Sequence, residues 1–253
     1  MKNINQLLRP GMVIAEIDAH PDDYVPHANA HYLIGQIGGI TRHNITLTRG
    51  ENTGKNYHSS KKFDPKKGHR EAEGREGARR MGFNSYKQLA GIDRQLYASE
   101  SWLVPKVAAL LVEREVDLVL TLSQMHPGDS PDHAAASAIA LKAAQLAHQA
   151  TRRSIGVLIL QGDKQGDVFA QTTPNSTLLA HQAAEANSSQ FRYGPLGDEP
   201  MAWPVVSSGQ TMHPDDLQAL LQYPVQQDAT YTFTQIGNVP MPTAAQLAVV
   251  STR

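Results

Sequence analysis

The sequence contains no cysteine among its 253 residues. A chain without cysteine has no disulfide framework, no thiolate metal ligand and no cysteine nucleophile, so any metal must be held by His, Asp or Glu. An excess of charge of one sign is also lacking, since 23 basic and 24 acidic side chains leave a formal net charge of -1. This balance argues against the general positive field with which many proteins bind nucleic acid, so we expect no nucleic-acid partner.

Long apolar segments are missing as well. No apolar run approaches the roughly 18 residues of a membrane span. The N-terminal stretch "MKNINQLLRPGMVIAEIDAH" has too short and too interrupted an apolar run for a signal peptide. We therefore expect a cytoplasmic protein without a membrane span. The length predicts one sizeable α/β domain over residues 1–253.

Strand-like apolar runs alternate with longer helical patterns, as is typical of βαβ units. The predicted strands cover residues 12–18, 43–48, a short stretch near 86–92, 116–122, 154–160 and 229–236. The predicted helices cover 27–38, 69–83 with Gly82 as a C-terminal cap, 102–114, 133–150, 176–188 and a segment starting near 214, and residues 50–68 are predicted as a loop. The pattern indicates a Rossmann-like, doubly wound α/β fold, with a mostly parallel sheet and helices on both faces.

Polar residues cluster where two of these predicted strands end. The segment "DAHPDD" (18–23) leaves the first strand, and "SQMHPGDSPDH" (123–133) leaves the fourth. Ligands in open doubly wound sheets bind beyond the carboxyl ends of the strands, commonly between the first and fourth, so His20, Asp22 and Asp23 are expected near Asp132 and His133. Two imidazoles and a carboxylate make a plausible three-ligand metal site with an open position for water, and a spare carboxylate beside it is well placed as a general base.

Other interpretations of these residues remain open. An aspartate after a strand is often only the N-cap of the next helix. The sequence repeats "HPDD" at 213–216, where a proline and an acidic first turn predict a helix start. No P-loop and no G-x-S-x-G elbow occurs. The basic segment 61–70 is followed at once by acidic residues, which favours a solvated loop, although it could attract an anionic sugar.

The order of several motifs is similar to that of the PIG-L/LmbE-like N-acetylglucosaminyl deacetylase family. "AHPDD" (19–23) resembles the family's AHPDDE motif, and "PDH" (131–133) resembles the end of its HPDH motif. Supporting segments follow in family order: "LTRGENTG" (47–54), "REAEGREGARRMG" (70–82), the strand before HPDH, and "NSSQ" (187–190) in place of H-x-S-Q. The resemblance covers roughly residues 12–190, and the ordered series is more specific than any single motif.

This resemblance implies a role for each matching residue. His20, Asp23 and His133 would hold a divalent metal, usually Zn2+, although a two-histidine, one-carboxylate set also suits Fe2+. Asp22 would be the general base for a metal-bound water that attacks the carbonyl carbon of an N-acetyl group. Asp132 would orient a histidine as a hydrogen-bond acceptor. Two residues after the second strand, Arg49 and Glu51, are predicted to contact the sugar.

Three positions depart from the family pattern. Tyr24 stands in place of a glutamate, Ser130 in place of a histidine expected to stabilise the oxyanion, and Asn187 in place of the histidine of H-x-S-Q. Each change removes an ionisable group near the expected catalytic position. His126, in the same loop as Ser130, and His27, where the family usually has glycine, are candidate replacements facing the substrate. The alternative is that His27 and the nearby His31 lie on the exposed side of the first helix.

We therefore expect a zinc-dependent N-deacetylase acting on an N-acetylglucosamine-type sugar, a glycoconjugate or a related small amide. The predicted catalytic residues are Asp22, Ser130 and Asp132. An alternative is a non-catalytic carbohydrate- or metabolite-binding protein that retains the metal site, which the three departures favour. A hydrolase of the same metal chemistry acting on another bond is a further alternative, and a homo-oligomer is compatible with the sequence.

Overall fold

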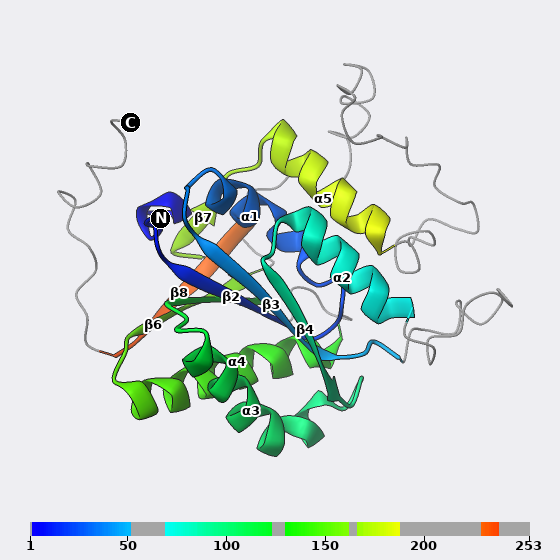
Figure 1. Cartoon of the computed structure of the whole chain (residues 1–253), viewed down its shortest axis with the longest axis vertical. Helices are drawn as coiled ribbons and strands as arrows, with labels where there is room; N and C mark the ends of the chain where they lie inside the picture. The colour runs from blue at the N-terminus through cyan, green and yellow to red at the C-terminus, as the bar shows by residue number, and fades with distance from the viewer. Residues whose placement is uncertain (1, 52–68, 123–129, 162–165, 188–228, 238–253) are drawn as a thin grey trace, which may run out of the picture.

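The computed structural model describes residues 2–51, 69–122, 130–161, 166–187 and 229–237. Within these ranges eight strands form one sheet in the order β1-β7-β8-β6-β5-β2-β3-β4 (Figure 1). The strands are β1 (Lys2–Asn3), β2 (Val13–Asp18), β3 (Thr41–Thr48), β4 (Ser85–Gly91), β5 (Leu118–Leu122), β6 (Ile155–Gln161), β7 (Val168–Ala170) and β8 (Ala229–Ile236). The strands β4, β3, β2, β5 and β6 are mutually parallel, whereas β8 runs antiparallel to both β6 and β7.

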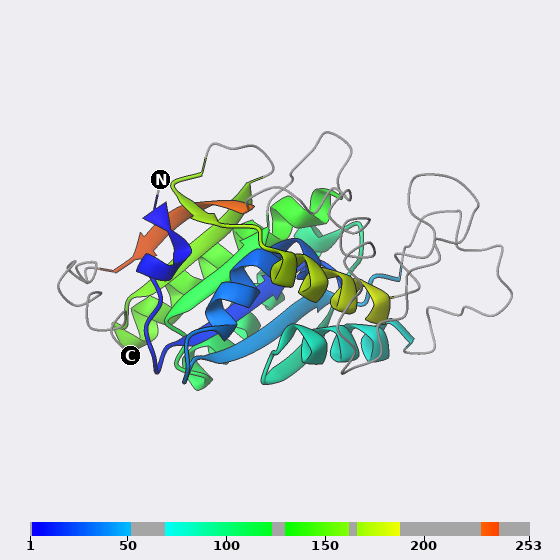
Figure 2. The ribbon, with the colours of Figure 1, turned by 90° about the horizontal axis from the view of Figure 1, so that it is seen from above.

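Helices cover both faces of the sheet. The α-helices are α1 (Ala28–Gly35), α2 (His69–Met81), α3 (Glu100–Glu113), α4 (Pro131–Thr151) and α5 (Pro174–Ala186), and the short 3-10 helices are η1 (Ile4–Gln6), η2 (Val25–His27) and η5 (Leu96–Ser99). One face carries α3 and α4, and the other carries α1, α2 and α5 (Figure 2). The fold is therefore the predicted doubly wound, mostly parallel α/β architecture.

The alternation of side chains along β2 assigns its residues to the two faces. Ala15 and Ile17 pack in the cluster under α3 and α4, and Ile14 packs under α1. Because side chains alternate along a strand, Glu16 and Asp18 point to the same face as Ile14. Two acidic residues therefore enter the interior beneath α1.

The predicted elements are confirmed with small shifts at their ends. The first and fourth predicted strands, now β2 and β5, are neighbours in the sheet, as the doubly wound order requires. Gly82 ends α2 with a φ of 86°, a left-handed conformation that glycine adopts without strain. The short strands β1 and β7 were not predicted, since two and three residues are too few for a periodic pattern. The predicted helix near residue 214 and most of the loop 50–68 lie outside the described residues.

None of the helices within the described ranges combines the length and the apolar character needed to cross a membrane.

Candidate metal centre

The loop that follows β2 folds back on itself, so that Asp23 approaches His20. The backbone N–H of His20 donates to Asp23 Oδ2 at 2.8 Å, and the backbone N–H of Asp23 donates to the carbonyl of His20 at 3.3 Å. His20 Nδ1 lies 3.3 Å from Asp23 Oδ2. The tight turn therefore sets one imidazole and one carboxylate side by side at the carboxyl end of the strand.

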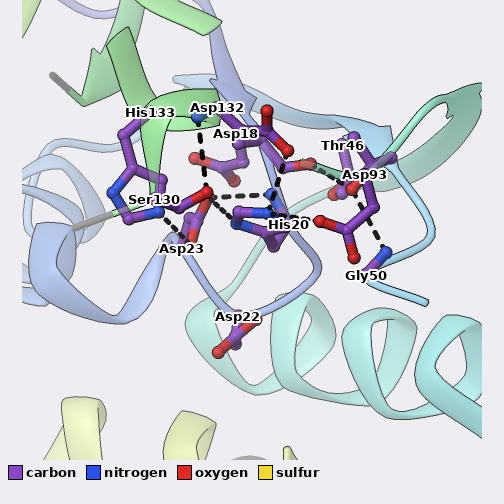
Figure 3. A network of polar contacts seen from close by, with 12 residues as sticks. Asp18, His20, Asp22, Asp23, Thr46, Gly50, Asp93, Ser130, Asp132 and His133 are labelled. Carbon is purple, nitrogen blue, oxygen red and sulfur yellow. Dashed lines mark hydrogen bonds and ion pairs between the residues drawn. The ribbon is translucent and has the colours of Figure 1, made fainter. Parts of the chain in front are cut away.

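The second histidine comes from the start of α4. Ser130 caps this helix by accepting the backbone N–H of Asp132, and Pro131 occupies the first turn. His133 follows directly, and its Nε2 lies 3.4 Å from Asp23 Oδ1. Because β2 and β5 are adjacent, the turn after β2 and the helix after β5 meet at the same end of the sheet (Figure 3).

We call His20, Asp23 and His133 the mouth cluster. One potential ligand atom from each residue lies within 4.8 Å of the other two. Two imidazole nitrogens and a carboxylate oxygen form a donor set that suits a divalent zinc or iron ion. The residues predicted as metal ligands are thus brought together by the fold in an arrangement that fits such an ion.

Two further carboxylates surround His20. Its Nε2 lies 3.2 Å from Asp93 Oδ1 and 3.6 Å from Asp132 Oδ2. Asp132 is itself held by the backbone N–H groups of Arg94 and Leu96, which donate to its two oxygens. An acceptor of this kind on one ring nitrogen orients a histidine so that the other nitrogen faces a metal.

These contacts set the ionisation of the cluster. Burial lowers the pKa of the His20 imidazole, but the charge of Asp23 and the hydrogen bonds to Asp132, Asp23 and Asp93 together raise that pKa well above its usual value. Burial opposes ionisation of Asp23, yet His20 and His133 outweigh burial and lower the pKa of the Asp23 carboxyl. The Asp23 carboxylate thus favours a positive charge at this point, and a divalent cation would supply that charge in place of a proton on His20.

Asp22 stands apart from the mouth cluster, on the side of α2 (Figure 3). Its Oδ1 accepts a hydrogen bond from Arg70 Nη2, and the Nη1 of the same guanidinium donates to the carbonyl of Gly50 at 2.8 Å. Gly50 has a φ of 62°, and an added Cβ would lie 2.0 Å from Arg70 Nη1. Glycine at this position therefore allows the buried Arg70 to reach Asp22.

Sequence reasoning missed Asp93 and Arg70 as members of this site. A signal existed for Arg70, which begins the segment "REAEGREGARRMG", but its contact with Asp22 depends on how α2 packs. Asp93 follows the short strand β4 and carries no distinctive motif. A carboxylate after a parallel strand was the only available hint.

Two of the three departures from the family pattern contact each other. Asn187 Nδ2 donates to the hydroxyl oxygen of Tyr24 at 2.6 Å, and the Tyr24 hydroxyl donates to the carbonyl of Gly74 at 3.2 Å. Both side chains are buried. A Cβ on Gly77 would lie 1.9 Å from the Tyr24 hydroxyl, so glycine at 77 makes room for this pair. Tyr24 and Asn187 thus form a packed hydrogen-bonded contact between the motif loop, α2 and α5.

The remaining predicted residues are dispersed. Arg49 is exposed and Glu51 is half-buried, both just beyond β3, while His126 lies outside the described residues. His27 and His31 have no exposed surface, so the alternative that they lie on the exposed side of the first helix is wrong. Without exposed surface His27 reaches no substrate in this conformation, which corrects its expected role as a substrate contact.

The fold and the site define a doubly wound α/β protein with a two-histidine, one-carboxylate centre where the strand order reverses. Residues 16–144, half of the chain, match the family model PIG-L, described as GlcNAc-PI de-N-acetylase. The chain belongs to this family. A comparison with curated proteins found no significant sequence match.

Several solved structures share the fold. N,N'-diacetylchitobiose deacetylase from Pyrococcus horikoshii is 17% identical, with a TM-score of 0.61 over 88% of this chain and 83% of that chain. The 4-carboxy-2-hydroxymuconate hydratase GalB from Pseudomonas putida KT2440 is 16% identical, with a TM-score of 0.61 over 92% of this chain and 100% of that chain. The zinc-inhibited form of teicoplanin deacetylase Orf2 is 17% identical, with a TM-score of 0.53 over 71% and 85%.

Proposed function

We propose that this protein is a metal-dependent N-deacetylase that removes the acetyl group from an amino sugar of the N-acetylglucosamine type. The observation that carries the proposal is the convergence of His20, Asp23 and His133, from two segments far apart in the sequence, on one point at the end of the sheet. Membership of the PIG-L family supports an N-deacetylase. The deacetylases among the structures of the same fold are consistent with it.

The mouth cluster would hold the metal, with zinc as the expected ion. A divalent cation there supplies a Lewis acid, which lowers the pKa of a water towards about 7 and polarises a carbonyl oxygen. His20 and His133 offer imidazole nitrogens and Asp23 offers a carboxylate oxygen. Asp93 and Asp132 keep the His20 ring in place through its Nε2.

Asp22 is the proposed general base. Asp22 lies in the loop between the proposed ligands His20 and Asp23, and its carboxylate is paired with Arg70 and does not belong to the mouth cluster. In the reaction it takes a proton from the attacking water and returns that proton to the amine that leaves. Arg70 orients the carboxylate through the contact with its Oδ1.

Ser130 bears on the rate of the reaction. Its hydroxyl accepts the backbone N–H of Asp132 and caps α4, where the family pattern has a histidine. Loss of one donor to a developing oxyanion typically costs about 10²–10³ in rate. We expect a slower enzyme than a relative with that histidine, unless His126 supplies the missing donor.

Two other functions remain as candidates. Ser130 favours a non-catalytic protein that binds a sugar through a retained metal site, because this replacement removes an imidazole from the expected site. A structure of the same fold is named a hydratase, so the architecture also serves a reaction other than deacetylation. This favours, as a further candidate, a hydrolase of the same metal chemistry that acts on another bond.

Metal analysis followed by amine release distinguishes these functions. Protein purified without a metal-affinity tag is assayed with a panel of N-acetyl sugars, after chelation and after return of zinc. Amine release that stops on chelation and returns with zinc supports the proposal. Bound metal without release from any sugar in the panel would contradict deacetylation of amino sugars and favour the binding protein.

A further inference from the structure

A second group of acidic and imidazole side chains lies inside the protein, under α1. Glu16 and Asp18 project from β2, and His27 ends η2. All three side chains have no exposed surface. We call these residues the buried cluster, and they share no member with the mouth cluster.

Each residue of the buried cluster has one polar atom that finds no partner among the surrounding donors, although Glu16 and Asp18 lie close enough to share a proton. These atoms are Glu16 Oε1, Asp18 Oδ1 and His27 Nε2. They lie within 4.8 Å of one another, and His27 Nε2 is 3.8 Å from Glu16 Oε1. Ligand atoms about 2.0–2.2 Å from a tetrahedral ion lie about 3.3–3.6 Å apart, so a small contraction would bring this pair into range. An unpartnered polar atom in the interior is costly, which makes three on one point a sign of a missing partner.

The other polar atom of each side chain is already held. Glu16 Oε2 contacts His31 Nε2, and Asp18 Oδ2 accepts a hydrogen bond from Asn44 Nδ2. His27 Nδ1 lies 3.4 Å from the hydroxyl of Tyr231 on β8. Metal ligands are typically fixed in this way by an outer hydrogen bond on the atom that does not bind the ion. The pattern therefore leaves one atom of each residue facing the common centre.

The surroundings also suit a cation. The Thr46 hydroxyl donates to Asn44 Oδ1, and this hydrogen bond fixes the direction in which the Asn44 amide donates to Asp18. Figure 3 shows Asp18 and Thr46 close to the mouth cluster. The positive charge of Arg42 acts to lower the pKa of Glu16. The Nη1 of Arg42 donates to the backbone carbonyls of His31 and Met81. Burial lowers the pKa of His27 to about 3, so its imidazole is neutral near pH 7, as a metal ligand must be.

We propose that Glu16, Asp18 and His27 bind a second divalent metal ion, separate from the one at the mouth cluster. One imidazole and two carboxylates form a donor set suited to zinc or a similar first-row metal. Its ligands flank the loop 19–24, with Asp18 just before it and His27 just after it. The ion would tie β2 to η2 and hold in place the loop that carries His20, Asp22 and Asp23. Because the site is closed to solvent, its role is structural.

Zinc binding to chelated, dialysed protein tests this inference. Wild type is expected to bind about two zinc ions per chain, and His27→Gln and Asp18→Asn about one each. His133→Ala is also expected to bind about one, and the double variant with His27→Gln none. Zinc should raise the melting temperature of His133→Ala, which keeps the buried cluster, more than that of His27→Gln. The matched control is His43→Gln, since His43 contacts Ser85 Oγ at 2.7 Å and belongs to neither cluster.

Two results would overturn the inference. One is the result that wild type binds a single zinc ion and that His133→Ala binds none. In that case the carboxyls of Glu16 and Asp18 would satisfy each other by sharing a proton. The other is a folded His27→Gln that binds as much zinc as wild type. Titration of the wild type needs no variant, so the inference stays testable if a variant fails to fold. Neither result depends on amine release, so failure of the proposed activity is distinguishable from failure of this site.

Discussion

The mouth cluster takes two of its residues from the loop 19–24, and the buried cluster takes its residues from the segments on either side of this loop in the sequence. The two clusters differ in their exposure to solvent. The side chains of His20, Asp23 and His133 are 13%, 9% and 15% exposed, whereas those of Glu16 and His27 are 0% exposed. Each cluster has imidazole and carboxylate donors within 4.8 Å. The donors of the proposed catalytic metal thus reach solvent, whereas those of the proposed structural metal do not.

Removal of the second imidazole of the mouth cluster has the largest expected effect. His133→Ala deletes one of three proposed ligands, and loss of about 5 kcal/mol of stabilisation by the metal corresponds to roughly a 10⁴-fold lower kcat/KM. Amine release from an N-acetyl sugar and metal content measure this. His148→Ala on the same helix is the control, since His148 Nδ1 contacts the carbonyl of Arg153 and His148 belongs to neither cluster. Unchanged activity would remove the mouth cluster from catalysis.

Asp22→Asn separates proton transfer from metal binding. The amide keeps the size of the side chain but cannot act as a base, so we expect kcat to fall roughly 10²–10³-fold while the metal content stays that of wild type. Glu113→Gln, an exposed change at the end of α3, should leave both unchanged. A fully active Asp22→Asn would refute the assigned role.

Asp132→Asn tests the support of the mouth cluster. The amide weakens the contact with His20 Nε2 and the acceptance of two backbone N–H groups, so metal affinity is expected to fall about 10–100-fold. Competition with a chelator measures the affinity. Asp117→Asn is the matched control, because Asp117 accepts the backbone N–H of Val13 away from the mouth cluster. Equal effects of the two changes would indicate general destabilisation.

The difference in access predicts two rates of metal loss. An ion in the mouth cluster can leave directly, whereas one in the buried cluster must wait for a local opening of η2 or α1, so its removal by chelator is expected to be at least about tenfold slower. A colorimetric chelator resolves the two phases, and His27→Gln should lose only the slow one. A slow phase that persists in this variant would place the slow ion elsewhere.

Tyr24→Phe has the smallest expected effect. It removes a hydroxyl that accepts from Asn187 and donates to Gly74, so the free energy of unfolding is expected to fall by about 1–2 kcal/mol. Denaturant unfolding measures this, with the exposed Tyr97→Phe as a control of about 0.5 kcal/mol or less. Deacetylation should remain near wild type, since the Tyr24–Asn187 contact joins packed elements. A large loss of activity without a loss of stability would instead give Tyr24 a role in the reaction.

Much of the fold was predictable because its signals are local. Apolar runs and turn residues placed the strands and helices within a few residues, and the doubly wound order then brought "AHPDD" and "PDH" to one end of the sheet. The short strands β1 and β7 escaped, because pairing with neighbours rather than periodicity defines them. Asp93 and Arg70 escaped for a similar reason, since only the packing of their elements brings them to His20 and Asp22.

The sequence by itself determined the class of fold and the donor residues of the mouth cluster, because the turn after β2 and the start of α4 are each encoded by residues that are neighbours in the sequence. Only the tertiary structure decided that Glu16 and Asp18 enter the interior with His27, and that Tyr24 meets Asn187. Burial and long-range contacts depend on which elements pack against each other. The same aspartate or histidine can therefore face solvent, a metal or a hydrogen-bond partner, according to the surface that covers it.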